Sequence, residues 1–245
     1  APQFINGTTG NGSTWQVADI YTAGTAGSSP RSLTLVGGVL YFKAATADGD
    51  ELWAHDPSNR STWQVADINS GSGHGMTSGD IMLVGDTMYF GGNDGSTGNE
   101  LWAHDTSNHS TWQVADINNG SGDSDPLYYH LRILVGDTLY FVADDGSTGH
   151  ELWAHDTSNH STWQVADINS GSGDSQAGVF MHYLVGDTIY FGASDGSTGN
   201  ELWAHDTSNH STWQVFDFYT GGSNGNIHSG FPGAKLDVLV GDTLY

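Results

Sequence analysis

The chain is built from a repeated unit of about 50 residues, and this repetition limits the possible folds more than any other feature. Three strings recur in a fixed order. STWQVADI or a close variant occupies 13–20, 61–68, 110–117, 161–168 and 211–218. ELWAHD occupies 51–56, 100–105, 151–156 and 201–206, and LVGDTLYF or a variant occupies 35–42, 83–90, 134–141, 184–191 and 239–245. A period of this length is typical of one blade of a β-propeller.

Each unit is predicted to form four strands, which we name a, b, c and d. In the third full unit they are residues 130–135, 138–143, 151–155 and 162–168. Gly136-Asp137 between a and b is a two-residue hairpin signal, because glycine tolerates the positive φ that such a turn requires. No segment shows sustained helical periodicity, so the predicted class is all-β.

The predicted strand b is apolar on both faces. Leu139 and Phe141 point to one face, and Tyr140 and Val142 point to the other. A sheet with two apolar faces must be covered on both sides, and blades stacked around an axis provide that cover.

The two ends of the chain complement each other. The N-terminal residues 1–20 supply strands that correspond to c and d, whereas residues 231–245 supply an a–b hairpin. Joined, they would form one composite blade. We therefore predict a single domain over 1–245, a five-bladed β-propeller of four-stranded antiparallel blades closed by its N-terminal strands. The alternatives are an open β-solenoid, or a fragment that completes its ring by oligomerising; we expect a monomer.

The repeat resembles the ELWxxDGT-repeat family. The matching residues are Glu151-Leu152-Trp153-Ala154-His155-Asp156, with Asp145-Gly146 and Gly149 upstream, Val165-Ala166-Asp167-Ile168, and Val135–Phe141. The chain departs from the pattern at Thr157-Ser158, where the family has Gly-Thr. The resemblance implies a secreted or cell-surface protein whose leader is absent from this chain, and it carries over no catalytic residue. The near-identity of units two to four indicates recent amplification or a designed sequence.

Charge and composition exclude several functions. The chain has 28 acidic against 5 basic residues and a formal net charge of −23. Such a field should repel nucleic acid and anionic membranes, and so few arginines argue against Arg clamps for phosphate or carboxylate. There is no cysteine, so disulfides and thiolate zinc sites are excluded. No apolar run is long enough to span a membrane.

The repeated tryptophans and histidines suggest binding sites, but a structural role explains them better. The tryptophans lie inside strand strings, and we expect them to pack between blades rather than to stack on sugars. Glu151, Trp153 and His155 share one face of strand c by its period of two. This strand is third from the axis, so its histidines should be too far apart to form a metal ring. In the c–d turn, Arg60 replaces His109, His160 and His210, which argues against metal binding there.

The b–c turns carry oxygen-rich sequences. They are residues 94–98, 145–149 and 195–199, each reading Asp-Gly-Ser-Thr-Gly. Such oxygens can bind Ca²⁺, but the spacing does not reproduce an EF-hand loop. We therefore interpret them as Asp-Gly turns, and we expect no required cofactor.

The d–a connections vary most among the units. They span 71–80, 120–130, 171–182 and 221–235, and nearly all length variation falls there. Variable loops on a constant scaffold are where binding function usually lies, although neutral drift explains them equally well. The candidate ligand-binding residues are Tyr128, Tyr129, His130, Phe180, His182, His228 and Phe231. By strand order, the d–a and b–c loops should lie on one edge of the propeller.

These observations predict a non-catalytic binding or adhesion module, with a glycan or another cell-surface ligand as partner. No G-x-S-x-G motif, P-loop or Cys–His pair supports an enzyme. The alternative is a structural repeat scaffold or model propeller without a specific ligand.

Overall fold

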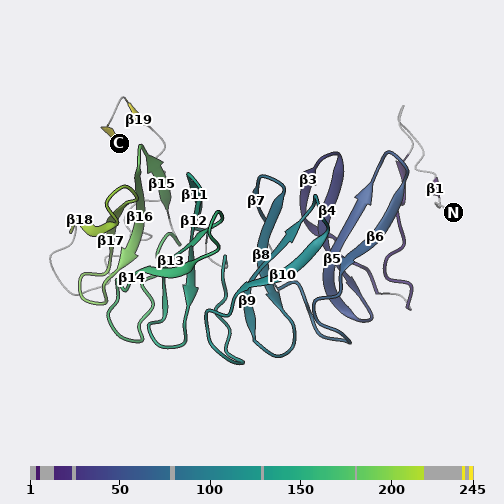
Figure 1. Ribbon diagram of the computed structural model, residues 1–245, viewed down its shortest axis with the longest axis horizontal. Coiled ribbons are helices and arrows are strands. Elements are labelled where there is room, and N and C mark those ends of the chain that lie inside the picture. Colours follow the sequence, from purple (N-terminus) through teal and green to yellow (C-terminus); the bar gives the residue numbers. More distant parts are fainter. Residues whose placement is uncertain are drawn as a thin grey trace. The chain divides into compact units, whose positions relative to one another are not determined.

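The computed structural model describes residues 4–5, 14–23, 26–77, 81–127, 130–179, 181–217, 239–240 and 243–244. These residues form strands, turns and irregular segments (Figure 1). The described part of the chain contains no helix that could cross a membrane.

Four four-stranded antiparallel sheets follow one another along the sequence, which confirms the all-β prediction. In each sheet the strands are ordered a, b, c, d as in the sequence. The first sheet contains β3 (Arg31–Val36), β4 (Val39–Thr46), β5 (Gly49–Asp56) and β6 (Ser61–Ala66). The second contains β7 (Met82–Val84), β8 (Thr87–Asn93), β9 (Asn99–Asp105) and β10 (Ser110–Ala115). The third contains β11 (Arg132–Val135), β12 (Thr138–Asp144), β13 (His150–Asp156) and β14 (Thr162–Ala166). The fourth contains β15 (His182–Val185), β16 (Thr188–Ser194), β17 (Asn200–Asp206) and β18 (Ser211–Phe216).

The chain divides into two compact units. The first comprises residues 1–96 and 102–112, and the second comprises 97–101 and 113–245. The contacts described below each lie within one of these units.

The observed strands agree with the predicted ones except at their ends. Strand d of the third sheet ends at Ala166 rather than Ile168. The physical reason is that the N–H of Ile168 donates to the carboxylate of Glu151, 2.8 Å away, instead of continuing the ladder. Strand a of the third sheet begins at Arg132 rather than His130, because the residues before it form an irregular segment. The a–b hairpin is as predicted, with Gly136 at φ 59°.

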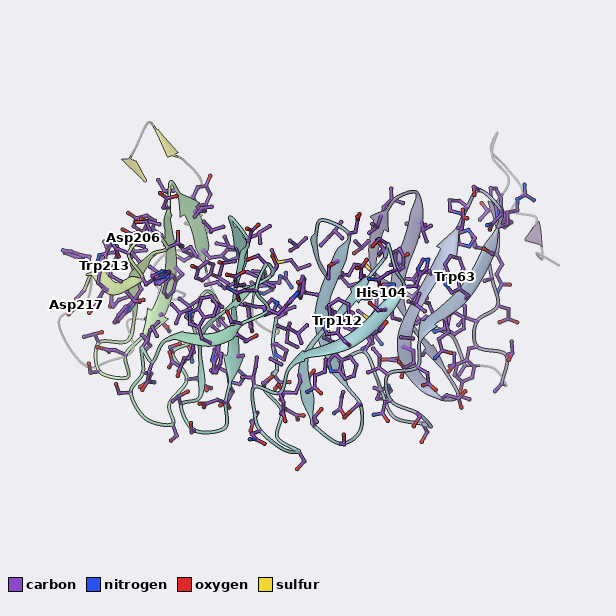
Figure 2. The ribbon with its side chains drawn as sticks, in the orientation of Figure 1. Trp63, His104, Trp112, Asp206, Trp213 and Asp217 are labelled. Carbon is purple, nitrogen blue, oxygen red and sulfur yellow. The ribbon has the colours of Figure 1, made fainter. Side chains whose placement is uncertain are left out.

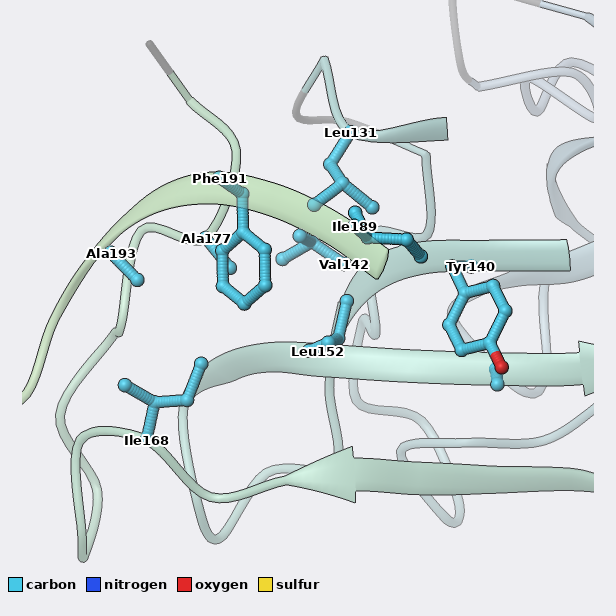
Figure 3. Close-up of a cluster of buried hydrophobic side chains, with 10 residues drawn as sticks. Leu131, Tyr140, Val142, Leu152, Ile168, Ala177, Ile189, Phe191 and Ala193 are labelled. Atoms are coloured by element: carbon cyan, nitrogen blue, oxygen red, sulfur yellow. The ribbon is translucent and has the colours of Figure 1, made fainter. Parts of the chain in front are cut away.

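The core of each unit lies between sheets. In the second unit, Tyr140, Val142 and Leu152 of the third sheet pack against Ile189 and Phe191 of the fourth (Figure 3). In the first unit, Tyr41 and Leu52 of the first sheet pack with Met88 and Phe90 of the second. In both cases the Tyr-bearing face of one sheet meets the Phe-bearing face of the next, as stacked blades require.

The chain ends form two short hairpins. β1 (Phe4–Ile5) pairs with β2 (Thr14–Trp15), and β19 (Leu239–Val240) pairs with β20 (Thr243–Leu244). Most of the predicted composite blade, 1–20 plus 231–245, lies outside the described residues. The fifth blade, ring closure and a single domain therefore stay predictions.

Candidate functional site

The repeated glutamate of strand c anchors the segment that follows strand d. The carboxylate of Glu51 accepts backbone N–H groups of Ile68 at 2.9 Å and Gly75 at 3.0 Å. Glu151 likewise accepts those of Ile168 at 2.8 Å and Asn169 at 3.1 Å. Burial raises the pKa of both carboxyls to about 7, although these hydrogen bonds oppose the shift. The glutamate therefore has a structural role that the sequence pattern did not reveal.

The repeated histidine of strand c is also structural. The Nδ1 of His205 lies 2.9 Å from the hydroxyl of Thr212 on strand d. Its ring centroid is 5.4 Å from that of Tyr140 in the preceding sheet. Burial lowers the pKa of His205 to about 4, so the side chain is neutral at pH 7. That these histidines lie too far apart to form a metal ring stays a prediction.

The tryptophans pack between sheets, as predicted. Trp102 of strand c contacts the core cluster of the first unit. Trp163 of strand d and Trp203 of strand c contact that of the second unit. Three tryptophans at the strand-d position differ, because they are more exposed: Trp15 at 53%, Trp213 at 38% and Trp63 at 37%. Figure 2 labels Trp63 and Trp213.

The Asp-rich turns use their carboxylates internally. Asp195 accepts backbone N–H groups of Ser197 and Thr198, both at 2.8 Å. Partial burial alone would raise the pKa of Asp195, but these bonds lower it to about 2. The c–d turn contains one residue in the left-handed backbone conformation. The four residues at this position have φ of 61–62°: Arg60, His109, His160 and His210. Among the described residues, no cluster of three or more histidine or acidic side chains could hold a metal ion.

In the three d–a connections that the structure describes, the first half belongs to the constant scaffold. Close contacts hold it against two b–c turns: a Cβ on Gly49 would overlap the carbonyl oxygen of Gly73, and a Cβ on Gly95 would touch the side chain of Asn69. Gly49 is the first residue of strand c in the same sheet, directly after its b–c turn, whereas Gly95 belongs to the b–c turn of the next sheet. The prediction that d–a and b–c loops share one edge is therefore confirmed within the units.

The second half of each connection interrupts strand a rather than forming a free loop. In the fourth sheet, the N–H of Ser194 donates to the carbonyl of Ser175 at 2.8 Å, and that of Gly192 donates to Met181 at 3.1 Å. The N–H of Gly178 donates in turn to the carbonyl of Gly192 at 2.8 Å, so strand b bonds to residues before and within an irregular segment, and regular strand a starts only at His182. We call the interrupting residues inserts: 76–81 before β7, 125–131 before β11 and 176–181 before β15. This corrects the predicted boundary of strand a and the interpretation of these segments as loops.

The inserts of the third and fourth sheets are in contact. Leu127 and Leu131, in the insert of the third sheet (125–131), are buried, with exposed fractions of 1% and 0%. The side chain of Leu131 lies so close to the backbone of Gly178 that a Cβ there would overlap it. Leu131 and Ala177, which belongs to the insert of the fourth sheet (176–181), lie in the same buried cluster (Figure 3). The described parts of these two variable segments therefore pack against each other.

Two of the predicted binding residues belong to these segments or follow them directly. His130 is exposed at the end of the third insert, and His182 is half-buried at the start of β15. The pKa of His182 is lowered, mainly by burial and to a smaller extent by the positive charges of Arg132 and His130. Arg132 was not among the predicted binding residues, although it occupies the same strand position as His182: each pairs with the phenylalanine of its own strand b. The remaining candidates, Tyr128, Tyr129, Phe180, His228 and Phe231, lie outside the described residues.

In the first three sheets, a second variable position links strand c to the d–a connection that follows the same sheet. The residue before the repeated glutamate is Asp50, Asn99, His150 or Asn200. The backbone N–H of Asn99 donates to the carboxylate of Asp123 at 2.7 Å, and the backbone N–H of His150 donates to the carboxylate of Asp174 at 2.8 Å. The residue types differ between the sheets, but a bond from strand c to the following connection is kept, so these pairs stabilise the fold.

Comparison with known proteins shows only the fold. No family model matches the chain, and no curated protein matches its sequence. A puromycin hydrolase structure matches with a TM-score of 0.53 and 14% identity, over 80% of this chain and 29% of the other. A puromycin-hydrolyzing peptidase of Mycobacterium tuberculosis matches with a TM-score of 0.52 and 13% identity, over 80% and 29%. The chain spans less than a third of these proteins, and what they share with it is the β-propeller fold.

Proposed function

We propose that this protein is a non-catalytic binding or adhesion module that recognises a glycan through the joined surface of its inserts. The observation that carries the proposal is the contact between Leu131 and Gly178. This contact joins the described parts of the variable segments of two sheets, and burial and the positive charges of Arg132 and His130 lower the pKa of His182 there. A single composite site on a repeated scaffold is the expected result of such an arrangement.

A non-catalytic role is supported by how the repeated polar groups are used. Glu151 binds backbone amides, His155 contacts the hydroxyl of Thr162, and Asp156 binds its own turn. These groups stabilise the fold, whereas an enzyme needs acids, bases or nucleophiles directed at a substrate.

The proposal includes a fifth blade. On the third sheet, Tyr140 is 2% exposed beneath the fourth sheet, but on the fourth sheet Val215 is 39% and Phe216 is 59% exposed. Such an apolar face is the kind of surface that another blade covers. We propose that the hairpins β1–β2 and β19–β20 together supply that blade and close the ring. We further propose membership of the ELWxxDGT-repeat type and a location outside the cell.

A glycan-array screen, with and without Ca²⁺, tests the function. The wild type should bind a restricted set of glycans without requiring the metal. Replacing Tyr128, Tyr129 and His130 by Ala should abolish that binding with little change in melting temperature. His160→Asn is the matched control, because His160 is an exposed histidine in a c–d turn, where asparagine tolerates the left-handed backbone.

Two outcomes would contradict the proposal. Absence of binding to every glycan by folded protein would favour the scaffold role. Retained binding in the triple variant, with about one ligand per blade, would move the site to the repeated tryptophans.

A further inference from the structure

The c–d turn of each four-stranded sheet carries an asparagine followed, two residues later, by a serine. The residue between them is arginine or histidine, never proline. This pattern, Asn-x-Ser or Asn-x-Thr, is the one at which enzymes attach sugars to asparagine. The four pairs are Asn59 and Ser61, Asn108 and Ser110, Asn159 and Ser161, and Asn209 and Ser211.

The turn presents the two groups that the pattern requires. Every asparagine and serine of the four pairs is exposed. In the third sheet, the carboxamide oxygen of Asn159 accepts the backbone N–H of Ser161 at 2.9 Å and its hydroxyl at 2.6 Å. Corresponding bonds occur in the other three turns. The asparagine amide and the serine hydroxyl are therefore held side by side at the surface.

The turn can keep its hydrogen bonds when a sugar is attached. Nδ2 of Asn159 carries two hydrogens, and one of them is donated to Oδ2 of Asp156 at 2.7 Å. In the transfer, a bond forms between Nδ2 and C1 of the sugar. The bond between C1 and the oxygen of a phosphate-linked carrier breaks, the carrier leaves with the electron pair, and Nδ2 loses one proton. One N–H remains for Asp156, and the carboxamide oxygen still accepts from Ser161.

The c–d turns lie at the edge of each sheet away from its b–c turn. In the third sheet, the c–d turn contacts the a–b hairpin, where the N–H of Thr157 donates to the carbonyl of Asp137 at 2.8 Å. The b–c turns and the d–a connections share the other edge, because successive strands are antiparallel. Sugars on the c–d turns would therefore leave the described parts of the inserts uncovered.

We infer that Asn59, Asn108, Asn159 and Asn209 are acceptor sites for N-linked sugars. The acceptor role rests on the proposed location outside the cell, and it does not depend on the proposed glycan ligand. Another exposed segment, Asn119-Gly120-Ser121, has the same pattern in a d–a connection. Among the described residues, no hydrogen bond joins the side chains of Asn119 and Ser121. This segment is the internal comparison, because it has the pattern without the turn geometry.

Secretion of the full chain from a eukaryotic host, behind a cleavable leader, tests the acceptor role. Enzymatic removal of the sugars in heavy-oxygen water labels each modified asparagine, and peptide mass spectrometry then measures its occupancy. Most molecules should carry a sugar at each of the four turns, and fewer should carry one at Asn119. Ser161→Ala should remove the sugar from Asn159 alone, whereas Ser161→Thr should keep it. The other three turns serve as controls in the same molecule.

The glycosylated chain should also keep its fold. Its melting temperature should lie within about 2 °C of that of the chain from a host without N-glycosylation, because exposed turns contribute little to stability. The glycan-array result should be the same for both preparations, since the sugars lie away from the insert edge.

Three outcomes would overturn the acceptor role. Secreted, folded protein without sugar at any of the four turns would exclude it. Occupancy at Asn119 but not at the turns would show that the turn geometry does not favour the transfer. A glycosylated chain that melts far below the unmodified one would show that the turns do not accommodate a sugar. Failure of the array to find any ligand would contradict the proposed function alone, because occupancy is measured independently.

Discussion

Glu151 accepts a 2.8 Å hydrogen bond from the backbone N–H of Ile168, seventeen positions later in the chain. This bond ends strand d and begins the segment that leads to the fourth sheet. Equivalent bonds join Glu51 to Ile68 and Glu100 to Ile117. The part of the repeat that looks most like a catalytic motif thus fixes the path of the chain toward the variable inserts.

Replacing Glu151 should destabilise the protein strongly. Glu151→Ala leaves the amides of Ile168 and Asn169 without their acceptor, and each unsatisfied buried donor costs about 1–3 kcal/mol. We expect the free energy of unfolding at pH 7, measured in urea, to fall by about 2–5 kcal/mol. Glu151→Gln, which keeps one acceptor, should lose less, and the exposed Asp137→Asn should change little. A loss below about 1 kcal/mol in Glu151→Ala would contradict the anchoring role.

Stability should be greatest at mildly acidic pH. Burial raises the pKa of Glu51, Glu100 and Glu151 from 4.5 to about 7. Their contribution is fully present below pH 4.5 and is lost as pH rises through 7. Burial lowers the pKa of three histidines from 6.5 to about 4, and their contribution is present above pH 6.5 and lost as pH falls through 4. These are His104, His155 and His205.

Melting temperatures between pH 4 and 8 check this balance, in 0.5 M NaCl to screen the net charge. The opposing contributions should place the maximum between about pH 5 and 6.5. Glu151→Gln should flatten the decline toward pH 8, and His104→Gln should flatten the decline toward pH 4. A wild-type maximum at pH 8, or profiles that both variants leave unchanged, would show that these groups do not control the pH dependence.

Gly49 should not tolerate a side chain. Its φ is +106°, and a Cβ would overlap the carbonyl oxygen of Gly73 in the d–a connection. Gly49→Ala should therefore lower the free energy of unfolding by about 3 kcal/mol or more, from backbone strain and overlap together. Gly37→Asn is the control, because Gly37 has a φ of +58° and open space around it. Equal stability of the two variants in urea would disprove the close packing of the connection.

Ring closure predicts a strong effect of truncation. If residues 1–20 complete the fifth blade, their deletion should expose apolar surface and strand edges, lower the melting temperature and promote association. Deletion of residues 1–2 alone is the control. Circular dichroism and light scattering measure both effects. A 21–245 chain that stays monomeric with an unchanged melting temperature would rule out the composite blade.

The sequence alone determined the repeated architecture. The period, the two apolar faces around Leu139 and Tyr140, and the Gly136-Asp137 turn are short-range signals, because side-chain alternation and turn geometry depend only on neighbouring residues. They predicted four-stranded sheets, the strand order and the structural role of the tryptophans.

Only the tertiary structure decided how distant segments meet. Glu151 binds amides of a later segment, and nothing in its strand period shows this. The inserts delay the start of regular strand a while still bonding to strand b, as Gly178 does to Gly192. The segments before β11 and β15 come together because Leu131 packs against Gly178 on the neighbouring sheet. Which faces of two sheets touch depends on long-range packing, and no local pattern encodes that contact.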